Sequence, residues 1–136
     1  IMNIVEYKEL SKKIIGDTFS VYNEYKGGLL ESAYQAAFVY LLRKDGFKVE
    51  EQKELPLFFR DVRLSKTYRM DIVINNQIIL ELKAVEEIRK EHRLQLFHYM
   101  RLTHIPIGLL INFSYSDGVH FEKYHFDETE NRCKAF

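Results

Sequence analysis

The stretch YRMDIVINNQIILELKA, residues 68–84, decides the fold. It contains two apolar runs typical of β-strands, separated by a short polar segment that is typical of a turn. Asp71, Glu81 and Lys83 interrupt these runs with charges. Because burying an unpaired charge is costly, the three side chains must be compensated by one another, by water or by a bound ion.

The register of the two strands decides whether these charges meet. Side chains alternate across a strand, so Glu81 and Lys83 project from one face. Asp71 joins them only if it lies opposite Glu81, which requires Ile74 opposite Ile78 and a three-residue loop between the strands. A two-residue turn would send Asp71 to the other face. In the first register the two carboxylates lie about 5 Å apart.

Two carboxylates at that separation favour a bound cation. They would repel each other by about 3 kcal/mol at an effective dielectric constant of 20. A divalent cation between them would turn this repulsion into a net attraction. Oxygen ligands favour Mg²⁺, with Mn²⁺ as a substitute. An alternative is that Asp71 and Glu81 form salt bridges with Lys83 and Arg69 on a partly exposed sheet face, and the spacing alone leaves both interpretations open.

The rest of the chain places this hairpin in a mixed sheet. Apolar residues at helical spacing predict helices over 4–25, 30–44 and from about 90 to before Pro106, and strands are predicted over 47–59, 60–75, 77–85, 105–113 and 119–126. Pro56 predicts an edge or a bulge, because proline cannot donate a ladder hydrogen bond. The predicted element order, ααβββαββ, indicates an α/β domain with helices packed against the sheet.

Composition limits the classes of function. A chain of 136 residues is expected to form a single domain over its whole length. Twenty basic and twenty acidic residues give a net charge of zero, so any nucleic-acid binding must use a local patch. The single cysteine, Cys133, excludes an intrachain disulfide framework and fits a reducing, cytoplasmic setting. No apolar run approaches the roughly 20 residues of a membrane helix, so no membrane partner is expected.

Three motifs resemble those of a known family. The stretch DIVINNQIILELK, residues 71–83, is similar to the core motif of the PD-(D/E)xK nuclease superfamily, although Met70 stands where that motif has proline. QLFHY, residues 95–99, resembles the QxxxY motif of the RecB-like branch. GLLESAY, residues 28–34, matches the signature of the GxxExxY family within that superfamily. The resemblance covers nearly the whole chain and implies a restriction-endonuclease-like mixed β-sheet flanked by helices.

The resemblance also implies a metal site. Asp71, Glu81, the Leu82 carbonyl and Glu31 would bind Mg²⁺, with Asp71 and Glu81 also acting in catalysis. Lys83 would hold or activate the attacking water and offset the charge that develops on the phosphate. For Glu31 the alternative is an acid placed favourably at a helix N-terminus.

The third helix supplies two more candidates. Gln95 and Tyr99 are four residues apart and so share a helical face, with His92 one turn earlier. The alternative is that Tyr99 packs in the core while Gln95 is merely exposed. Following the motif, Gln95 is expected to bind or orient groups at the site, and Tyr99 to contact a phosphate or support the site. His92 is a weaker candidate, because most lone histidines have no chemical role.

Basic residues near the acids could contact a phosphate backbone. The candidates are Arg69, Lys90 and Arg93, together with Arg60, Arg63, Lys66 and Arg89. The alternative for each is an ordinary solvated charge.

The sequence therefore predicts a Mg²⁺-dependent nuclease acting on nucleic acid, with DNA preferred. One alternative is a non-catalytic nucleic-acid-binding or protein-interaction module on a nuclease-like fold. Another is a structural domain in which the acids pair with lysine and arginine. The sequence does not decide whether the substrate is DNA or RNA, or whether cleavage occurs at the ends or in the interior of the strand. It does not decide the oligomeric state either, although a homodimer would help so small a nuclease to hold a duplex.

Overall fold

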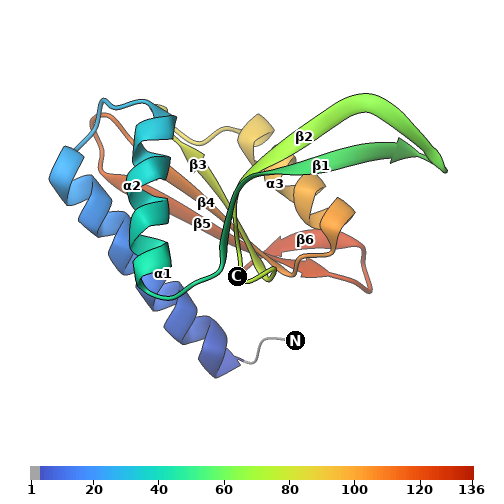
Figure 1. Cartoon of the computed structure of the whole chain (residues 1–136), viewed down its shortest axis with the longest axis horizontal. Helices are drawn as coiled ribbons and strands as arrows, with labels where there is room; N and C mark the ends of the chain where they lie inside the picture. The colour runs from blue at the N-terminus through green and yellow to red at the C-terminus, as the bar shows by residue number, and fades with distance from the viewer. Residues whose placement is uncertain (1–3) are drawn as a thin grey trace.

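The computed structural model describes residues 4–136. The helices are α1 (Ile4–Tyr25), α2 (Glu31–Lys44) and α3 (Lys90–Thr103), and the strands are β1 (Val49–Phe59), β2 (Val62–Ile74), β3 (Ile78–Lys83), β4 (Ile107–Phe113), β5 (Val119–Asp127) and β6 (Arg132–Ala135). All six strands form one sheet in chain order (Figure 1). None of these helices combines the length and the apolar character needed to cross a membrane.

The sheet is mixed. Strands β3 and β4 run parallel, while the other neighbours pair antiparallel. Parallel neighbours need a long crossover connection, and α3 provides it. The architecture confirms the predicted restriction-endonuclease-like class. The predicted order lacked β6, because an edge strand of four residues is too short for its alternation to stand out from chance.

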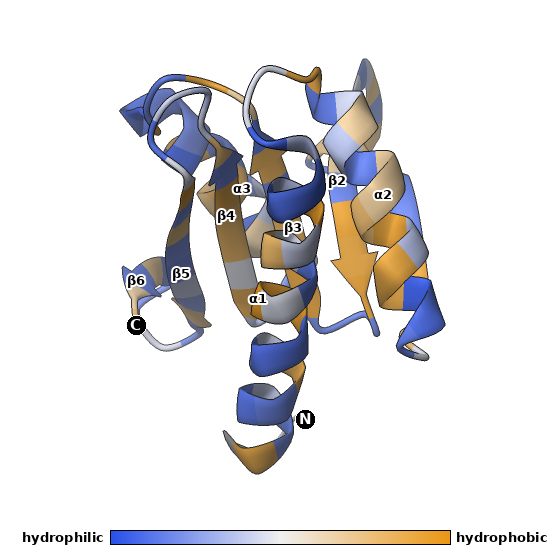
Figure 2. Ribbon diagram, turned by 90° about the vertical axis from the view of Figure 1, so that its left-hand side faces the viewer, coloured by the Kyte–Doolittle hydropathy of each residue, from blue (hydrophilic) through white to orange (hydrophobic). Residues whose placement is uncertain are grey.

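Helices cover both faces of the sheet. Helices α1 and α2 pack on one face, and α3 packs on the other, so the domain has three layers (Figure 2). The core on the α1 and α2 side includes Phe38, Leu42, Ile72, Leu80, Leu109 and Phe113. The core on the α3 side includes Met70, Val73, Ile79, Leu96, Met100 and Leu110. Consecutive residues of the central strands therefore contribute to opposite cores, as strand alternation requires.

The predicted hairpin register is confirmed. Ile74 lies opposite Ile78, and the three residues between them form the loop. Asn75 and Asn76 have φ angles of 51° and 55°, a left-handed conformation that asparagine tolerates better than most residues. The backbone N–H of Gln77 donates to the Ile74 carbonyl at 2.9 Å and closes the turn.

The β2–β3 ladder is short. Its last pair is Ile72 with Leu80, and beyond it β2 leaves β3 and continues only with β1. We call residues 55–68 of this hairpin the projecting arm. Its base, at Leu55 and Tyr68, packs against the core on the α3 side, and its outer half extends away from the three layers (Figure 1). A register shift lies between Pro56 and Phe58, which confirms the bulge predicted at Pro56.

Candidate active site

Asp71 and Glu81 meet at the point where β2 and β3 diverge. The backbone N–H of Asp71 donates to Oε1 of Glu81 at 3.1 Å, and the backbone N–H of Leu82 donates to Oδ2 of Asp71 at 2.8 Å. Both N–H groups lie just past Ile72 and Leu80, the last pair of the ladder between the two strands. Each carboxylate thus accepts a hydrogen bond from the opposite strand, which fixes both side chains next to each other.

Burial and the neighbouring Asp71 disfavour the charged form of Glu81. Glu81 is only 2% exposed, and burial together with the negative charge of Asp71 raises its pKa well above the usual range. The positive charge of Lys83 opposes this rise in the pKa without cancelling it. A carboxylate in this position is stabilised either by a proton or by a cation that lies close to both acids.

Lys83 is held by α3. Its Nζ donates to Oε1 of Gln95 at 3.1 Å, and Nε2 of Gln95 donates to the Tyr99 hydroxyl at 3.0 Å. The structure therefore brings Lys83, Gln95 and Tyr99 together, as the helical spacing of the last two predicted. Tyr99 is 2% exposed, and burial followed by the negative charge of Glu81 raises its pKa to about 12, so its hydroxyl keeps its proton at neutral pH.

The salt-bridge alternative for the acids does not match these contacts. Within residues 4–136, no ion pair joins Lys83 to Asp71 or Glu81. Arg69 instead pairs with Glu54 at 3.4 Å across the hairpin, where both side chains are exposed.

Glu31 lies at the start of α2, within electrostatic range of the acid pair. Partial burial raises the pKa of Glu31, the positive charge of Lys83 lowers it and the negative charge of Asp71 raises it. Among the described residues, however, no three His, Cys, Asp or Glu side chains gather into a group that could hold a metal ion. The role of Glu31 as a third ligand therefore stays a prediction.

The other two positions of the Gly28-Glu31-Tyr34 motif build the loop before α2. Gly28 has a φ angle of 104°, which L residues rarely adopt. The Tyr34 hydroxyl donates to the Lys26 carbonyl at 2.5 Å and accepts from the Leu29 N–H at 3.2 Å, while its ring stacks on another aromatic ring of the core. These contacts position Glu31 at the first turn of α2.

Two glutamines at the site were not predicted. Nε2 of Gln52 donates to Oδ1 of Asp71 at 3.3 Å and to Oε1 of Gln35 at 3.0 Å, and Nε2 of Gln35 donates to the Asp71 carbonyl at 3.3 Å. Gln35 follows Glu31 by four residues, so helical spacing could have indicated it. Gln52 reaches Asp71 from a backbone with φ of 45°, for which the sequence gives no signal.

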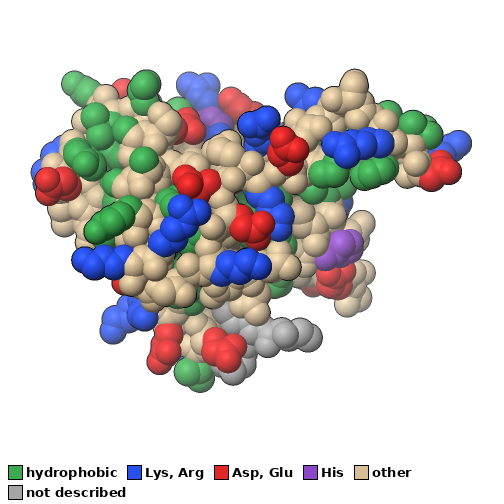
Figure 3. Space-filling model, viewed as in Figure 1, with side chains coloured by type: hydrophobic (Ala, Val, Ile, Leu, Met, Phe, Trp, Pro, Cys, Tyr) green, Lys and Arg blue, Asp and Glu red, His purple; other side chains and the backbone are tan. Residues whose placement is uncertain are grey.

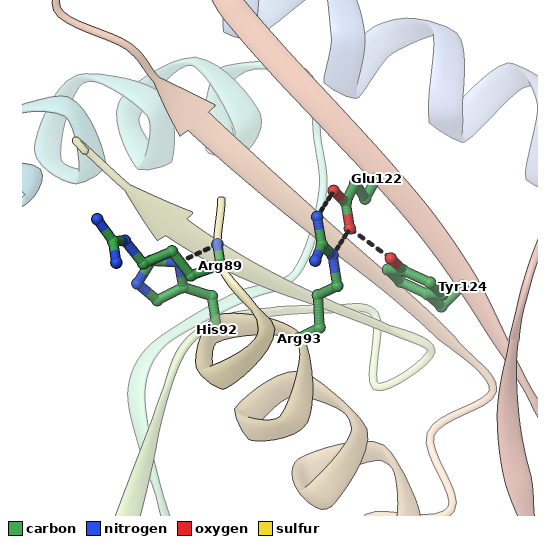
Figure 4. Close-up of polar contacts among 5 residues, drawn as sticks. All are labelled: Arg89, His92, Arg93, Glu122 and Tyr124. Atoms are coloured by element: carbon green, nitrogen blue, oxygen red, sulfur yellow. Dashed lines mark hydrogen bonds and ion pairs between the residues drawn. The ribbon is translucent and has the colours of Figure 1, made fainter. Parts of the chain in front are cut away.

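Arg93 forms a tight ion pair. Its Nε and Nη2 donate to the two carboxylate oxygens of Glu122 at 2.7 and 2.8 Å, and the Tyr124 hydroxyl donates to the same carboxylate (Figure 4). The hydrogen bond to Glu122 raises the pKa of Arg93, and the same bond lowers the pKa of Glu122. This pair ties α3 to β5, and the prediction that Arg93 also contacts nucleic acid stays untested.

The start of α3 holds the remaining candidates. Nδ1 of His92 accepts a hydrogen bond from the Arg89 N–H at 2.9 Å, which satisfies a free donor at the helix N-terminus (Figure 4). This contact favours the structural alternative for His92. Lys90 is exposed in the first turn, and its predicted contact with nucleic acid stays a prediction.

The donor set fits a hard divalent cation. Asp71, Glu81 and the Leu82 carbonyl offer oxygen atoms only, which Mg²⁺ and Mn²⁺ prefer. The raised pKa of the Glu81 carboxyl is the second observation that supports the fit, because a cation would stabilise the charged form that burial and the charge of Asp71 disfavour.

The mixed sheet, with the acid pair at the strand divergence, is the arrangement that the resemblance to nucleases implied. The sequence profile of the PD-(D/E)XK nuclease superfamily matches residues 8–123. The chain belongs to this superfamily. The narrower assignment to the GxxExxY family stays a prediction.

Structural comparison agrees with this fold. The crystal structure of SSO0001 is similar to this chain with a TM-score of 0.55 and 19% sequence identity. The similarity covers 93% of this chain and 62% of SSO0001, so this chain spans less than two thirds of that protein. At this identity the likeness indicates the fold alone. A search of curated protein sequences finds no match.

Proposed function

We propose that this domain is a divalent-metal-dependent nuclease that hydrolyses phosphodiester bonds in DNA in the cytoplasm. The observation that carries the proposal is the contact of Asp71 with Glu81 beside a lysine that α3 holds in place. Membership of the nuclease superfamily supports it.

Oxygen atoms at the strand divergence would hold the cation. Asp71, Glu81 and the Leu82 carbonyl supply these atoms, and Glu31 faces the same region from α2. Mg²⁺ is the proposed ion, with Mn²⁺ as a substitute. When bound, it would supply positive charge that polarises the scissile phosphate and makes water a better nucleophile at neutral pH.

The chain's own residues organise the hydrolysis. A water oxygen forms a bond to phosphorus, the P–O bond to the leaving oxygen breaks, and the proton lost by the water balances the one gained by the leaving oxygen. Lys83 faces this region with its ammonium fixed by Gln95, so it can orient the water and stabilise the negative charge that grows on the phosphate oxygens. Gln95 and Tyr99 act as positioning residues for Lys83.

A cleavage assay tests the proposal. Single-stranded and double-stranded DNA are incubated with the protein and Mg²⁺ or Mn²⁺, beside Asp71→Asn, Lys83→Ala and the exposed-lysine control Lys12→Ala. We expect each site variant to lose about 100-fold or more in rate, Lys12→Ala to match the wild type, and EDTA to abolish cleavage. Equal rates for Asp71→Asn and the wild type would contradict the residue assignment.

The cleavage assay, together with calorimetry, distinguishes a nuclease from a non-catalytic binding module. A non-catalytic binding module on this fold would bind DNA without cleaving any substrate, and calorimetry would detect no metal binding. Absence of cleavage of DNA and RNA with both metals would favour that alternative.

We also propose that two copies act on one duplex, because a chain with a single acid pair cuts one strand at a time. A homodimer is expected to convert supercoiled plasmid directly to linear product. Accumulation of nicked circles before linear product would contradict the dimer.

A further inference from the structure

The projecting arm packs against nothing along its outer half. Every residue from 58 to 66 is exposed, and among residues 4–136 the two strands there pair only with each other (Figures 1 and 3). An isolated two-stranded ribbon is marginally stable in water. An exposed ribbon of this length is therefore a candidate for binding a partner that covers it.

The arm is positively charged within a neutral chain. Arg60, Arg63 and Lys66 lie on its outer half with one acid, Asp61, whereas the whole chain has zero net charge. None of these three cations takes part in an ion pair among the described residues. They are therefore available to phosphate groups.

Apolar side chains gather at the tip. Phe58, Phe59 and Val62 are 54%, 60% and 58% exposed, and they flank the tight turn at Arg60, whose φ angle is 57°. The Arg60 guanidinium lies over the Phe59 ring at 5.2 Å. Aromatic side chains surrounded by cations suit contacts with bases, either by stacking or by insertion between base steps.

The arm leads directly into the acid pair. Strand β2 runs from Val62 at the tip to Asp71 at the site, a path of about 30 Å along a fully extended strand at 3.3 Å per residue. At its base, the Lys66 ammonium lies over the Tyr68 ring at 5.3 Å, and that ring lies 5.9 Å from the ring of Tyr99. A duplex held at the acid pair would meet the tip about nine base pairs away, at 3.4 Å per base pair.

We propose that the projecting arm is a nucleic-acid-binding arm: Arg63 and Lys66 bind backbone phosphates beside the scissile bond, and the Phe58 and Phe59 tip contacts bases about one helical turn away. This inference rests on the proposed function and extends it to how the substrate is held. The excess of unpaired positive charge favours a polyanion over a second copy of this neutral chain as the partner of the arm.

A binding experiment without cleavage tests the cationic part. Fluorescence anisotropy of a labelled 24-base-pair duplex in EDTA is measured against salt for the wild type, for Arg63→Ala/Lys66→Ala, and for Lys8→Ala/Lys12→Ala, which removes the same charge from the exposed face of α1. Losing two phosphate contacts should make the slope of log K against log salt less negative by about 1.8 and weaken binding at low salt by roughly tenfold. An arm variant that behaves like the α1 variant would overturn the proposal.

A second experiment tests the tip. A 2-aminopurine base is placed about nine base pairs from the position bound at the acid pair, or only three base pairs from it. Binding should raise the fluorescence of the distant base in the wild type, and Phe58→Ala/Phe59→Ala should remove most of that rise while leaving the signal of the near base unchanged. Equal signals from wild type and tip variant would overturn the tip contact.

The outcomes separate this inference from the nuclease proposal. If no DNA is cleaved but the arm variants lose affinity, the arm proposal holds and the nuclease proposal fails. If DNA is cleaved and the arm variants bind and cut like the wild type, the arm proposal alone is wrong. Sedimentation of the arm variants tests whether the arm instead binds a second copy of this chain. A loss of dimer without a loss of DNA affinity would show that it does and would overturn the arm proposal.

Discussion

At the scale of single residues, the acid pair has a structural role as well as a chemical one. Asp71 and Glu81 accept backbone N–H groups that the β2–β3 ladder no longer pairs, so the strands can separate without burying unsatisfied donors. The same contacts hold two carboxyl groups together in a largely buried place, where charging both has a cost in stability that a cation would offset.

The substitution Glu81→Gln separates these two roles. A glutamine amide oxygen can still accept the Asp71 N–H but carries no charge, so we expect the metal-free variant to melt at a higher temperature than the wild type at pH 8. Millimolar Mn²⁺ should raise the melting temperature of the wild type and leave that of the variant unchanged, because only the wild type gains from binding. Thermal unfolding with and without Mn²⁺ measures both effects, and equal stabilisation by Mn²⁺ would contradict the assignment of Glu81 as a ligand.

Gln95 is expected to position Lys83. In Gln95→Ala the ammonium loses its acceptor at 3.1 Å, and we expect kcat to fall about 10- to 100-fold while KM stays within about twofold. Tyr99→Phe, which removes only the hydroxyl that Gln95 contacts, should have a smaller effect on kcat. Steady-state kinetics on DNA measures both constants, and a change confined to KM would instead place Gln95 in substrate binding.

The sequence predicted the residues whose positions follow from local periodicity. Strand alternation places Glu81 beside Lys83, helical spacing places Gln95 beside Tyr99, and the loop length places Asp71 opposite Glu81. It did not predict Gln52, because that side chain reaches Asp71 only through a left-handed backbone at the point where the hairpin bends.

At the scale of elements, the contact between α1 and the end of α2 is sensitive to pH. Burial, followed by the hydrogen bond and the negative charge of Asp45, raises the pKa of Asp17 to about 7, while Lys13 opposes the rise. The folded state thus holds a proton that the unfolded chain, with an ordinary pKa of 3.8, releases at lower pH. The stability from this proton is fully present below about pH 4 and is lost as the pH rises to about 7.

Asp17→Asn should remove this dependence. Asparagine keeps a hydrogen-bond donor toward Asp45 at every pH, so we expect the variant to be more stable than the wild type above pH 7 and similar to it near pH 4. Chemical denaturation at several pH values measures the difference, with Asp61→Asn on the exposed arm as the control. Parallel stability profiles for Asp17→Asn and the wild type would show that the two carboxyl groups do not share a proton.

Elements were predicted better than their arrangement. The periodicity of residues 47–75 predicted the two long strands of the hairpin, but no local pattern indicates that the β2–β3 ladder ends at Ile72 and Leu80. The projecting arm was therefore not foreseen, although Pro56 correctly indicated a bulge in it.

At the scale of the whole molecule, both cores share one sheet. Ile72 and Val73 are neighbours in β2 but pack on opposite faces, the first against α1 and α2, the second against α3. Neither core can lose its strands without disrupting the other, so the chain is expected to unfold as one unit. The single domain over residues 1–136, expected from the length of the chain, stays a prediction, and this sharing supports it.

Matched truncations on the two faces test this prediction. Leu42→Ala on α2 and Met100→Ala on α3 each remove a fully buried side chain, and each should destabilise the fold by about 2–5 kcal/mol. Because the sheet couples the two faces, both variants should shift the same single transition, with far-ultraviolet circular dichroism and tyrosine fluorescence giving coincident curves. The nine tyrosines include Tyr34 in one core and Tyr99 in the other, so their summed fluorescence reports on both cores. Separate domains would give two transitions, and each truncation would then move only one of them.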